Sequence, residues 1–141
     1  MEKGRFVIQE HHATKLHWDL RLEMDGILKS WALPKTPLVE KGEKRLAIQT
    51  EDHDLSYIDF EGEIPEGLYG AGKVTIWDSG NYEIESRKPE KLVFILKGEK
   101  MKGRYTLLRW KRRGEKDWLF FRAADKPKKK TKKKENKKEE E

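Results

Sequence analysis

Residues 16–31 read LHWDLRLEMDGILKSW, and this stretch indicates the fold class. Every second residue of Trp18–Leu22 is apolar, which is the period of a β-strand with one face against a core. The Asp25-Gly26 pair that follows is typical of a tight turn between two antiparallel strands. We therefore expect one strand on each side of this pair, at Leu16–Glu23 and Ile27–Trp31.

The same short period continues along most of the chain. Further turn signals occur at Asp78-Ser79-Gly80 and Lys97-Gly98, and no long helical period is visible. The expected strands are Arg5–Gln9, Leu16–Glu23, Ile27–Trp31, Arg45–Thr50, Lys73–Trp77, Tyr82–Glu85, Leu92–Leu96, Gly103–Trp110 and Trp118–Ala123. Many short strands at close spacing predict an all-β fold, a small closed or partly open barrel with short connecting turns.

The length and composition restrict the classes of protein to consider. A chain of 141 residues fits one domain that buries a core of its own. It contains no cysteine, which excludes thiolate metal sites, cysteine nucleophiles and disulfides and suits a reducing compartment. The longest apolar run, Leu92–Leu96, is too short to span a bilayer, and no signal peptide is evident. We expect a soluble, cytoplasmic protein with no membrane partner.

The positive charge is concentrated at the C-terminus. The formal net charge is +6, but residues 126–141 contain nine Lys and four Glu, so they alone account for +5. This segment lacks aromatic and branched apolar residues, and we expect it to be a disordered Lys/Glu-rich tail after a domain at 1–125. Because the remaining residues are nearly neutral, any affinity of the domain for DNA must come from local patches.

Residues that ligate metals and bind phosphate share one face of the second expected strand. His17, Asp19 and Arg21 alternate with the apolar residues, and His11 precedes them by a short turn. Two imidazoles and a carboxylate suit Mn²⁺, Fe²⁺ or Zn²⁺, and the planar guanidinium of Arg21 matches a phosphate group. The alternative to a functional site is that this face is simply the solvated outer face of a surface strand. His12 should point to the opposite face, so we leave it outside the site.

A second cluster, EDHDLSY, supplies His53 and Tyr57, which could reach the same site if the segment forms a helical turn or tight loop. The glycine-rich EGLYGAG at residues 66–72 lacks the features of a phosphate-binding loop, and we expect it at a corner of the barrel. The spacing alone leaves two other functions open: a non-haem iron oxygenase and a non-catalytic nucleic-acid-binding barrel.

Two long segments carry a family resemblance. FVIQEHHATKLHWDLRLEMDGILKSWALPK at residues 6–35 and RLAIQTEDHDLSYIDFEGEIPEGLYGAGKVTIWDSG at residues 45–80 resemble the 3′-phosphoesterase domain of bacterial DNA ligase D, including its stand-alone archaeal and bacterial versions. The similarity runs from about Arg5 to Ala123. It implies an enzyme of non-homologous end joining that removes 3′-terminal ribonucleosides and 3′-phosphates from DNA and leaves a 3′-OH.

The resemblance also implies roles for particular residues. Its metal ligands match His11, His17 and Asp19, with Mn²⁺ as the expected ion. Its phosphate contacts match Arg21, His53 and Tyr57, which we expect to be catalytic. Further polar positions, which we expect to bind substrate, match Gln9, Lys35, Arg45 and Glu51. The expected partners are DNA 3′ ends, together with a ligase, polymerase or end-binding protein acting in trans.

Overall fold

The computed structural model describes residues 2–124, so the expected tail at 126–141 lies outside the described residues. The described part consists of β-strands and one short 3₁₀ helix. In chain order these are β1 (Glu2–His12), β2 (Leu16–Met24), β3 (Ile27–Leu33), β4 (Lys44–His53), η1 (Leu55–Asp59), β5 (Gly62–Ile64), β6 (Gly72–Lys88), β7 (Lys91–Lys97), β8 (Lys102–Arg109) and β9 (Asp117–Arg122).

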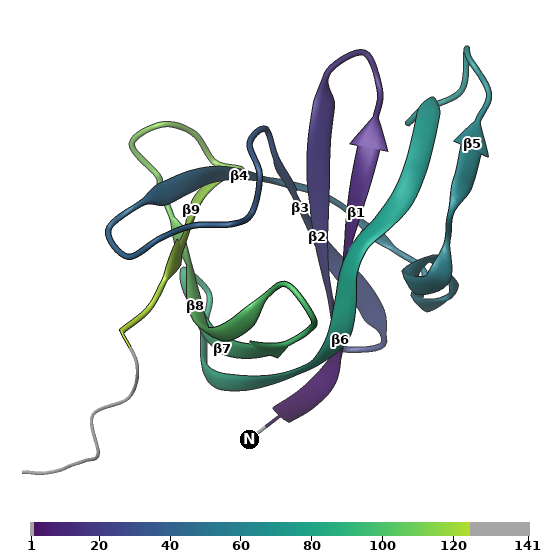
Figure 1. Ribbon diagram of the computed structural model, residues 1–141. Helices are drawn as coiled ribbons and strands as arrows, with labels where there is room; N and C mark the ends of the chain where they lie inside the picture. Colours follow the sequence, from purple (N-terminus) through teal and green to yellow (C-terminus); the bar gives the residue numbers. More distant parts are fainter. Residues whose placement is uncertain (1, 125–141) are drawn as a thin grey trace, which may run out of the picture.

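Eight of the strands form a closed antiparallel barrel, which confirms the predicted fold class (Figure 1). Their order around the barrel is β1-β2-β3-β4-β9-β8-β7-β6, and pairing of β6 with β1 closes the ring. The ninth strand, β5, pairs with the first residues of β6 and lies outside this ring, on the same side as η1. In the part of the chain that the structure describes, no helix is long and apolar enough to cross a membrane.

The predicted hairpin at the start of the chain is confirmed. β2 and β3 pair antiparallel, with Met24 opposite Ile27, so Asp25 and Gly26 form a two-residue turn. Their φ angles are 57° and 80°, the positive values that such a turn requires of both central residues. This turn sets the register that places Asp19 beside Ala32 and Arg21 beside Ser30.

The predicted break at Asp78-Ser79-Gly80 is wrong, because β6 continues through it as one 17-residue strand. The Asp78 carboxylate does not initiate a turn. It accepts hydrogen bonds from three backbone N–H groups of the β7–β8 loop, those of Glu99, Lys100 and Met101, at 2.9, 3.1 and 2.8 Å. Gly80 is needed for close approach, since a Cβ there would lie 2.3 Å from the carbonyl oxygen of Lys97.

The barrel interior holds the main apolar core, to which all eight ring strands contribute. Trp18, Leu20 and Leu22 face this core, as their alternation predicts. A second, smaller apolar cluster lies on the outer face, where Val7 and Leu28 pack against Ile58 of η1. The outer face of β1–β3 is therefore partly covered as well, so polar residues on it are buried rather than solvated.

Candidate functional site

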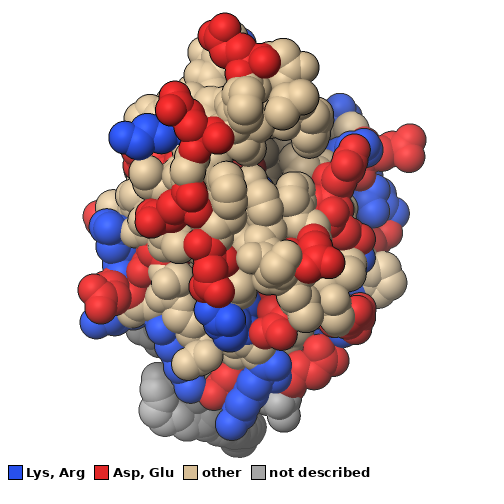
Figure 2. Space-filling model, turned by 90° about the vertical axis from the view of Figure 1, so that its right-hand side faces the viewer, with Lys and Arg blue, Asp and Glu red and all other residues tan. Residues whose placement is uncertain are grey.

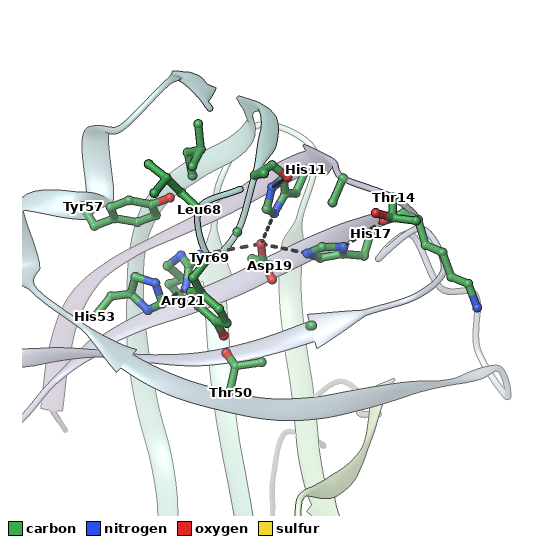
Figure 3. Close-up of a pocket in the computed structure, with 16 residues that line it drawn as sticks. His11, Thr14, His17, Asp19, Arg21, Thr50, His53, Tyr57, Leu68 and Tyr69 are labelled. Atoms are coloured by element: carbon green, nitrogen blue, oxygen red, sulfur yellow. Dashed lines mark hydrogen bonds and ion pairs between the residues drawn. The ribbon is translucent and has the colours of Figure 1, made fainter. Parts of the chain in front are cut away.

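A cavity of about 730 Å³ lies on this covered outer face (Figure 3). Strands β1 to β4 form its floor, and η1 with the segment before β6 forms its walls. The residues that line it are His11, Ala13, Thr14, Lys15, His17, Asp19, Arg21, Ala32, Thr50, His53, Tyr57, Ile64, Leu68, Tyr69, Gly70 and Ala71. All six residues predicted as metal ligands or phosphate contacts thus meet in one cavity.

The three predicted metal ligands converge on one point. Asp19 Oδ2 lies 3.6 Å from His11 Nδ1 and 3.3 Å from His17 Nε2. The candidate ligand atoms of the three residues all lie within 4.8 Å of one another. The cross-strand register explains this, because His11 pairs with His17 and Gln9 pairs with Asp19 across β1 and β2.

Backbone carbonyls hold both imidazoles in the orientation that metal binding needs. His11 Nε2 lies 3.2 Å from the Ala71 oxygen, and His17 Nδ1 lies 3.1 Å from the Lys15 oxygen. A carbonyl oxygen can only accept, so these nitrogens carry protons, and in a neutral ring the opposite nitrogen, on the side of Asp19, keeps the lone pair that a metal ion would use. This donor set of two nitrogens and a carboxylate fits a divalent transition metal.

The electrostatics of the cluster favour an ionised carboxylate. Burial by itself would raise the pKa of Asp19, but the hydrogen bond that the protonated ring of His17 donates and the charge of Arg21 together lower it. The same hydrogen bond with Asp19 raises the pKa of His17 against the opposing effect of burial. Asp19 is only 5% exposed, and these two neighbours keep its buried carboxylate in the charged form that a metal ion would bind.

Arg21 lies directly beside this cluster and is also 5% exposed. Its Nε donates to Gln9 Oε1 at 2.6 Å, and its Nη1 donates to Ser30 Oγ at 2.8 Å. Nη2 lies 3.6 Å from Asp19 Oδ2, and the guanidinium carbon is 4.9 Å from the centre of the Tyr57 ring. These contacts fix the plane of the guanidinium, and Nη2 keeps a second N–H for which the described residues supply no acceptor.

Gln9 connects Arg21 to the helix that covers it. While its Oε1 accepts from Arg21, its Nε2 donates to the carbonyl oxygens of Tyr57 and Phe60, both at 3.1 Å. The side chain is completely buried, and these contacts use both N–H groups of the amide. The structure therefore gives Gln9 a positioning role toward Arg21 and Tyr57.

His53 and Tyr57 both reach the cavity because the segment that carries them forms a helical turn, the condition stated from the sequence. His53 is the last residue of β4, and Tyr57 lies in η1, which Asp54 caps through the Ser56 N–H. A bulge in the β3–β4 pairing places His53, like Thr50, on the cavity side although three positions separate them. The rings of His53 and Tyr57 are 4.8 Å apart, and the Tyr57 hydroxyl points into the cavity (Figure 3).

Burial lowers the pKa of His53, and the nearby charge of Arg21 lowers it further, which favours the neutral form of the ring. Its Nδ1 lies 3.1 Å from Arg21 Nη1 and 3.0 Å from the Glu51 oxygen. The two contacts need different tautomers of the neutral ring: Nδ1 accepts from Arg21 when the proton is on Nε2, and donates to the Glu51 oxygen when Nδ1 carries the proton. Burial raises the pKa of Tyr57, so its hydroxyl stays protonated and can donate a hydrogen bond.

The other residues expected to bind substrate do not line this cavity. Lys35 is exposed, as is Glu51, whose backbone oxygen contacts His53. Arg45 donates to the carbonyl oxygens of Thr36 and Leu38, which ties down the segment between β3 and β4. Direct substrate contact by these three residues stays a prediction. His12 lies outside the cavity as expected and contacts Glu10 at 2.6 Å.

The glycine-rich segment is the part of the site that the sequence analysis missed. It does not form a corner of the barrel, because it connects β5 to β6 outside the ring. Leu68, Tyr69, Gly70 and Ala71 instead form a wall of the cavity, and Tyr69 is 79% exposed. A Cβ on Gly72 would lie 2.3 Å from the His12 oxygen, so glycine permits the close approach of this wall to β1.

Charge on the face that carries η1 and β5 is mixed. Figure 2 shows acidic and basic side chains interspersed around its edge, with other residues at its centre. No broad basic field is visible on this face, in agreement with the near-neutral composition before residue 126. Attraction of a phosphate group to the cavity therefore depends on local groups such as Arg21.

Comparison with known proteins agrees with this geometry. Residues 9–109 match the sequence model of the DNA Ligase D 3′-phosphoesterase domain. The chain is 48% identical over 127 residues to the multifunctional non-homologous end joining protein LigD of Pseudomonas aeruginosa, a match that covers 86% of this chain and 15% of that protein. It is 50% identical over 132 residues to the protein of the same name from Mycolicibacterium smegmatis, covering 86% of this chain and 17% of that protein. The chain therefore spans a small part of these relatives, and it belongs to the family of DNA ligase D 3′-phosphoesterase domains.

Proposed function

We propose that this protein is a Mn²⁺-dependent 3′-end-healing phosphoesterase of DNA. It removes a terminal ribonucleoside by phosphodiester cleavage and then removes the remaining 3′-phosphate, which leaves a 3′-OH. Membership of a phosphoesterase family supports the hydrolase class and a role in end processing. The observation that carries the finer proposal is the convergence of His11, His17 and Asp19 beside Arg21 in one cavity.

His11 Nδ1, His17 Nε2 and Asp19 Oδ2 are the atoms that would hold the metal ion. A divalent ion supplies positive charge next to a phosphoryl oxygen, as a Lewis acid. Neutral imidazoles are needed for this, and the hydrogen bonds to Ala71 and Lys15 leave the correct nitrogens available. The same ligand types occur in non-haem iron enzymes, so the neighbouring residues have to identify the reaction.

Those neighbours favour phosphoryl chemistry. Arg21 is held rigidly by Gln9 and Ser30, so its remaining N–H can stabilise charge on a phosphoryl oxygen without reorganisation. Tyr57 presents a protonated hydroxyl to the same space and can donate to a second oxygen. A bound phosphate dianion would favour protonation of His53, and the charged ring supplies a further donor.

The proposed product, a DNA end with a 3′-OH, indicates which substrate the enzyme would take. A 3′-OH is the end that polymerases and ligases extend or seal, so the enzyme would act before such a partner in trans. The test is incubation with a primer-template whose primer ends in a single ribonucleotide, with Mn²⁺ and with a chelator. We expect a shortened primer with a 3′-phosphate that converts to a 3′-OH, and no reaction in the chelator.

An all-DNA primer serves as the control for substrate recognition and should react more slowly at its terminal nucleotide. Absence of cleavage of both the ribonucleotide primer and a 3′-phosphorylated primer, with each divalent transition metal tried, would refute the proposed function.

A further inference from the structure

A second cavity, of about 390 Å³, opens at one end of the barrel. It faces the barrel interior: Trp31 lies between Ser30 and Ala32 in β3 and points to the opposite side from them. The residues that line it are Met24, Lys29, Trp31, Gln49, Arg87, Lys88, Pro89, Leu92, Arg109 and Trp118, none of which lines the first cavity.

Two buried hydrogen-bond donors in this cavity have no partner. Among the described residues, Trp31 Nε1 and Arg109 Nε are the buried side-chain atoms without a hydrogen bond. Trp31 is only 1% exposed, so leaving its N–H unsatisfied is costly. Trp118, in the same cavity, shows the usual arrangement, because its Nε1 donates to Gln49 at 3.1 Å.

The charge of the cavity is positive. Four basic residues and no acidic residue line it within the part of the chain that is described. Arg87 pairs with Asp25 and Glu2, and Lys29 lies 3.6 Å from Asp52, so these two are largely neutralised. Among the described residues, no carboxylate lies within ion-pair distance of Lys88 or Arg109, which leaves these two to attract an anion.

The aromatic and apolar walls of the cavity suit a ligand that carries an organic group as well as an anion. The Arg109 guanidinium lies 5.6 Å from the centre of the Trp118 ring, and Trp118 meets Trp31 edge to face at 5.7 Å. Met24, Pro89 and Leu92 add apolar wall. Beyond the cavity the β8–β9 turn continues with Trp110, Lys111, Arg112 and Arg113, of which Lys111 pairs with Glu90 and Arg113 pairs with Asp117.

We propose that this cavity is a second binding site, for a phosphate group of a nucleotide or a nucleic-acid strand. Both unsatisfied atoms are donors with almost no accessible surface of their own, so a ligand acceptor would reach them only after a small shift of the cavity wall. Phosphate oxygens are acceptors that also complement the charges of Arg109 and Lys88. The indole and aliphatic walls accommodate a sugar or base next to that phosphate. The site does not depend on the proposed end-healing activity, because it shares no residue with the first cavity.

The test follows the indole N–H resonance of Trp31 in a ¹H–¹⁵N spectrum, assigned by its loss in Trp31→Phe. Inorganic phosphate, a deoxynucleoside monophosphate and a short single-stranded oligonucleotide are titrated separately at constant ionic strength. We expect a saturable shift of this resonance with at least one phosphate probe. Saturation by phosphate alone indicates a free oxyanion site, whereas a response to the oligonucleotide alone indicates a strand-binding site.

Arg109→Gln and Arg112→Gln form the matched pair of variants. Each removes one positive charge, Arg109 at the end of β8 and Arg112 in the turn that follows, but only Arg109 lines the cavity. We expect Arg109→Gln to weaken binding about tenfold or more, the effect of losing one charged hydrogen bond, and Arg112→Gln to change it less than about twofold. No saturable Trp31 shift with any probe, or equal weakening by both variants in spectra that show folded protein, would overturn the proposal.

Discussion

Asp19 and Arg21 are charged residues that the fold removes almost completely from water. Isolated buried charges are strongly unfavourable, so their burial requires partners. Arg21 has them in Gln9, Ser30, His53 and Asp19, and Asp19 has them in the two imidazoles. The pair is therefore held in place by the same contacts that would prepare it for the proposed metal ion and anionic substrate.

His11 and His12 are adjacent residues with different predicted roles, which makes them a matched pair. His11→Ala removes one of the three proposed ligands, so Mn²⁺ affinity should fall by at least about a hundredfold, more than the loss of a residue that only orients a ligand. His12→Ala should leave the affinity unchanged, because His12 contacts Glu10 outside the cavity. Calorimetric titration with Mn²⁺ measures both, and equal affinities of the two variants would remove His11 from the metal site.

Arg21→Lys tests the role of the guanidinium fork. The ammonium keeps the charge but cannot hold Gln9 and Ser30 while also presenting an N–H to phosphate. We expect the turnover rate to fall by about one hundredfold, the cost of one lost transition-state contact, with Mn²⁺ affinity nearly unchanged. Single-turnover kinetics and calorimetry on the same preparation separate the two effects, and a variant with wild-type turnover would contradict the assigned role.

At the scale of elements, a few side chains fix the segments that connect or cover the strands of this barrel. Gln9 joins β1 to η1, Asp54 caps η1, and Asp78 of β6 organises the β7–β8 loop through three backbone N–H groups. Asp78 is buried, so its hydrogen bonds are shielded from solvent. The loop therefore depends on a residue about twenty positions earlier in the chain.

Asp78→Asn should destabilise the fold by about 2 kcal/mol, because an amide offers one acceptor where the carboxylate offers two charged ones. Asp59→Asn is the control, since the Asp59–Arg5 pair is exposed and such pairs contribute less than about 1 kcal/mol. Urea unfolding of both variants provides the comparison. If Asp78→Asn cost no more than Asp59→Asn, the three hydrogen bonds would not be essential to the loop.

At the scale of the whole molecule, most of the net positive charge lies outside the residues that carry the candidate site. Residues 126–141 contribute +5 of the net +6, and the face that carries η1 and β5 is of mixed charge. Lysines bound to backbone phosphates release counterions without reading sequence, so they affect affinity and its dependence on salt. The buried cluster of Asp19 and Arg21 is insensitive to salt by comparison.

Deletion of residues 126–141 should therefore flatten the salt dependence of DNA binding and leave turnover at saturating DNA largely intact. Binding measured at about 50 and 200 mM salt gives the slope, which should fall as phosphate contacts are lost. A truncated protein that binds Mn²⁺ but fails to turn over saturating substrate would assign these residues a role in the reaction.

The sequence alone determined the fold class and the residues that gather at the site. The alternation of residues 16–31 is a property of neighbours two positions apart, so it fixed one apolar and one polar face on β2 before any tertiary contact was known. The Asp25-Gly26 turn and the cluster at His53 and Tyr57 are equally local. The family resemblance then supplied the expected roles of these residues.

Only the tertiary structure decided that the polar face of β2 is buried, and which nitrogen and oxygen atoms converge where a metal ion would bind. The cover over it comes from η1 and the glycine-rich wall, and the imidazole of His11 is oriented by the Ala71 carbonyl, 60 residues away. The continuous β6 likewise depends on the distant loop that uses the Asp78 carboxylate. Such contacts leave no periodic signal, because they depend on how remote segments pack, and local propensity cannot report what a side chain will meet there.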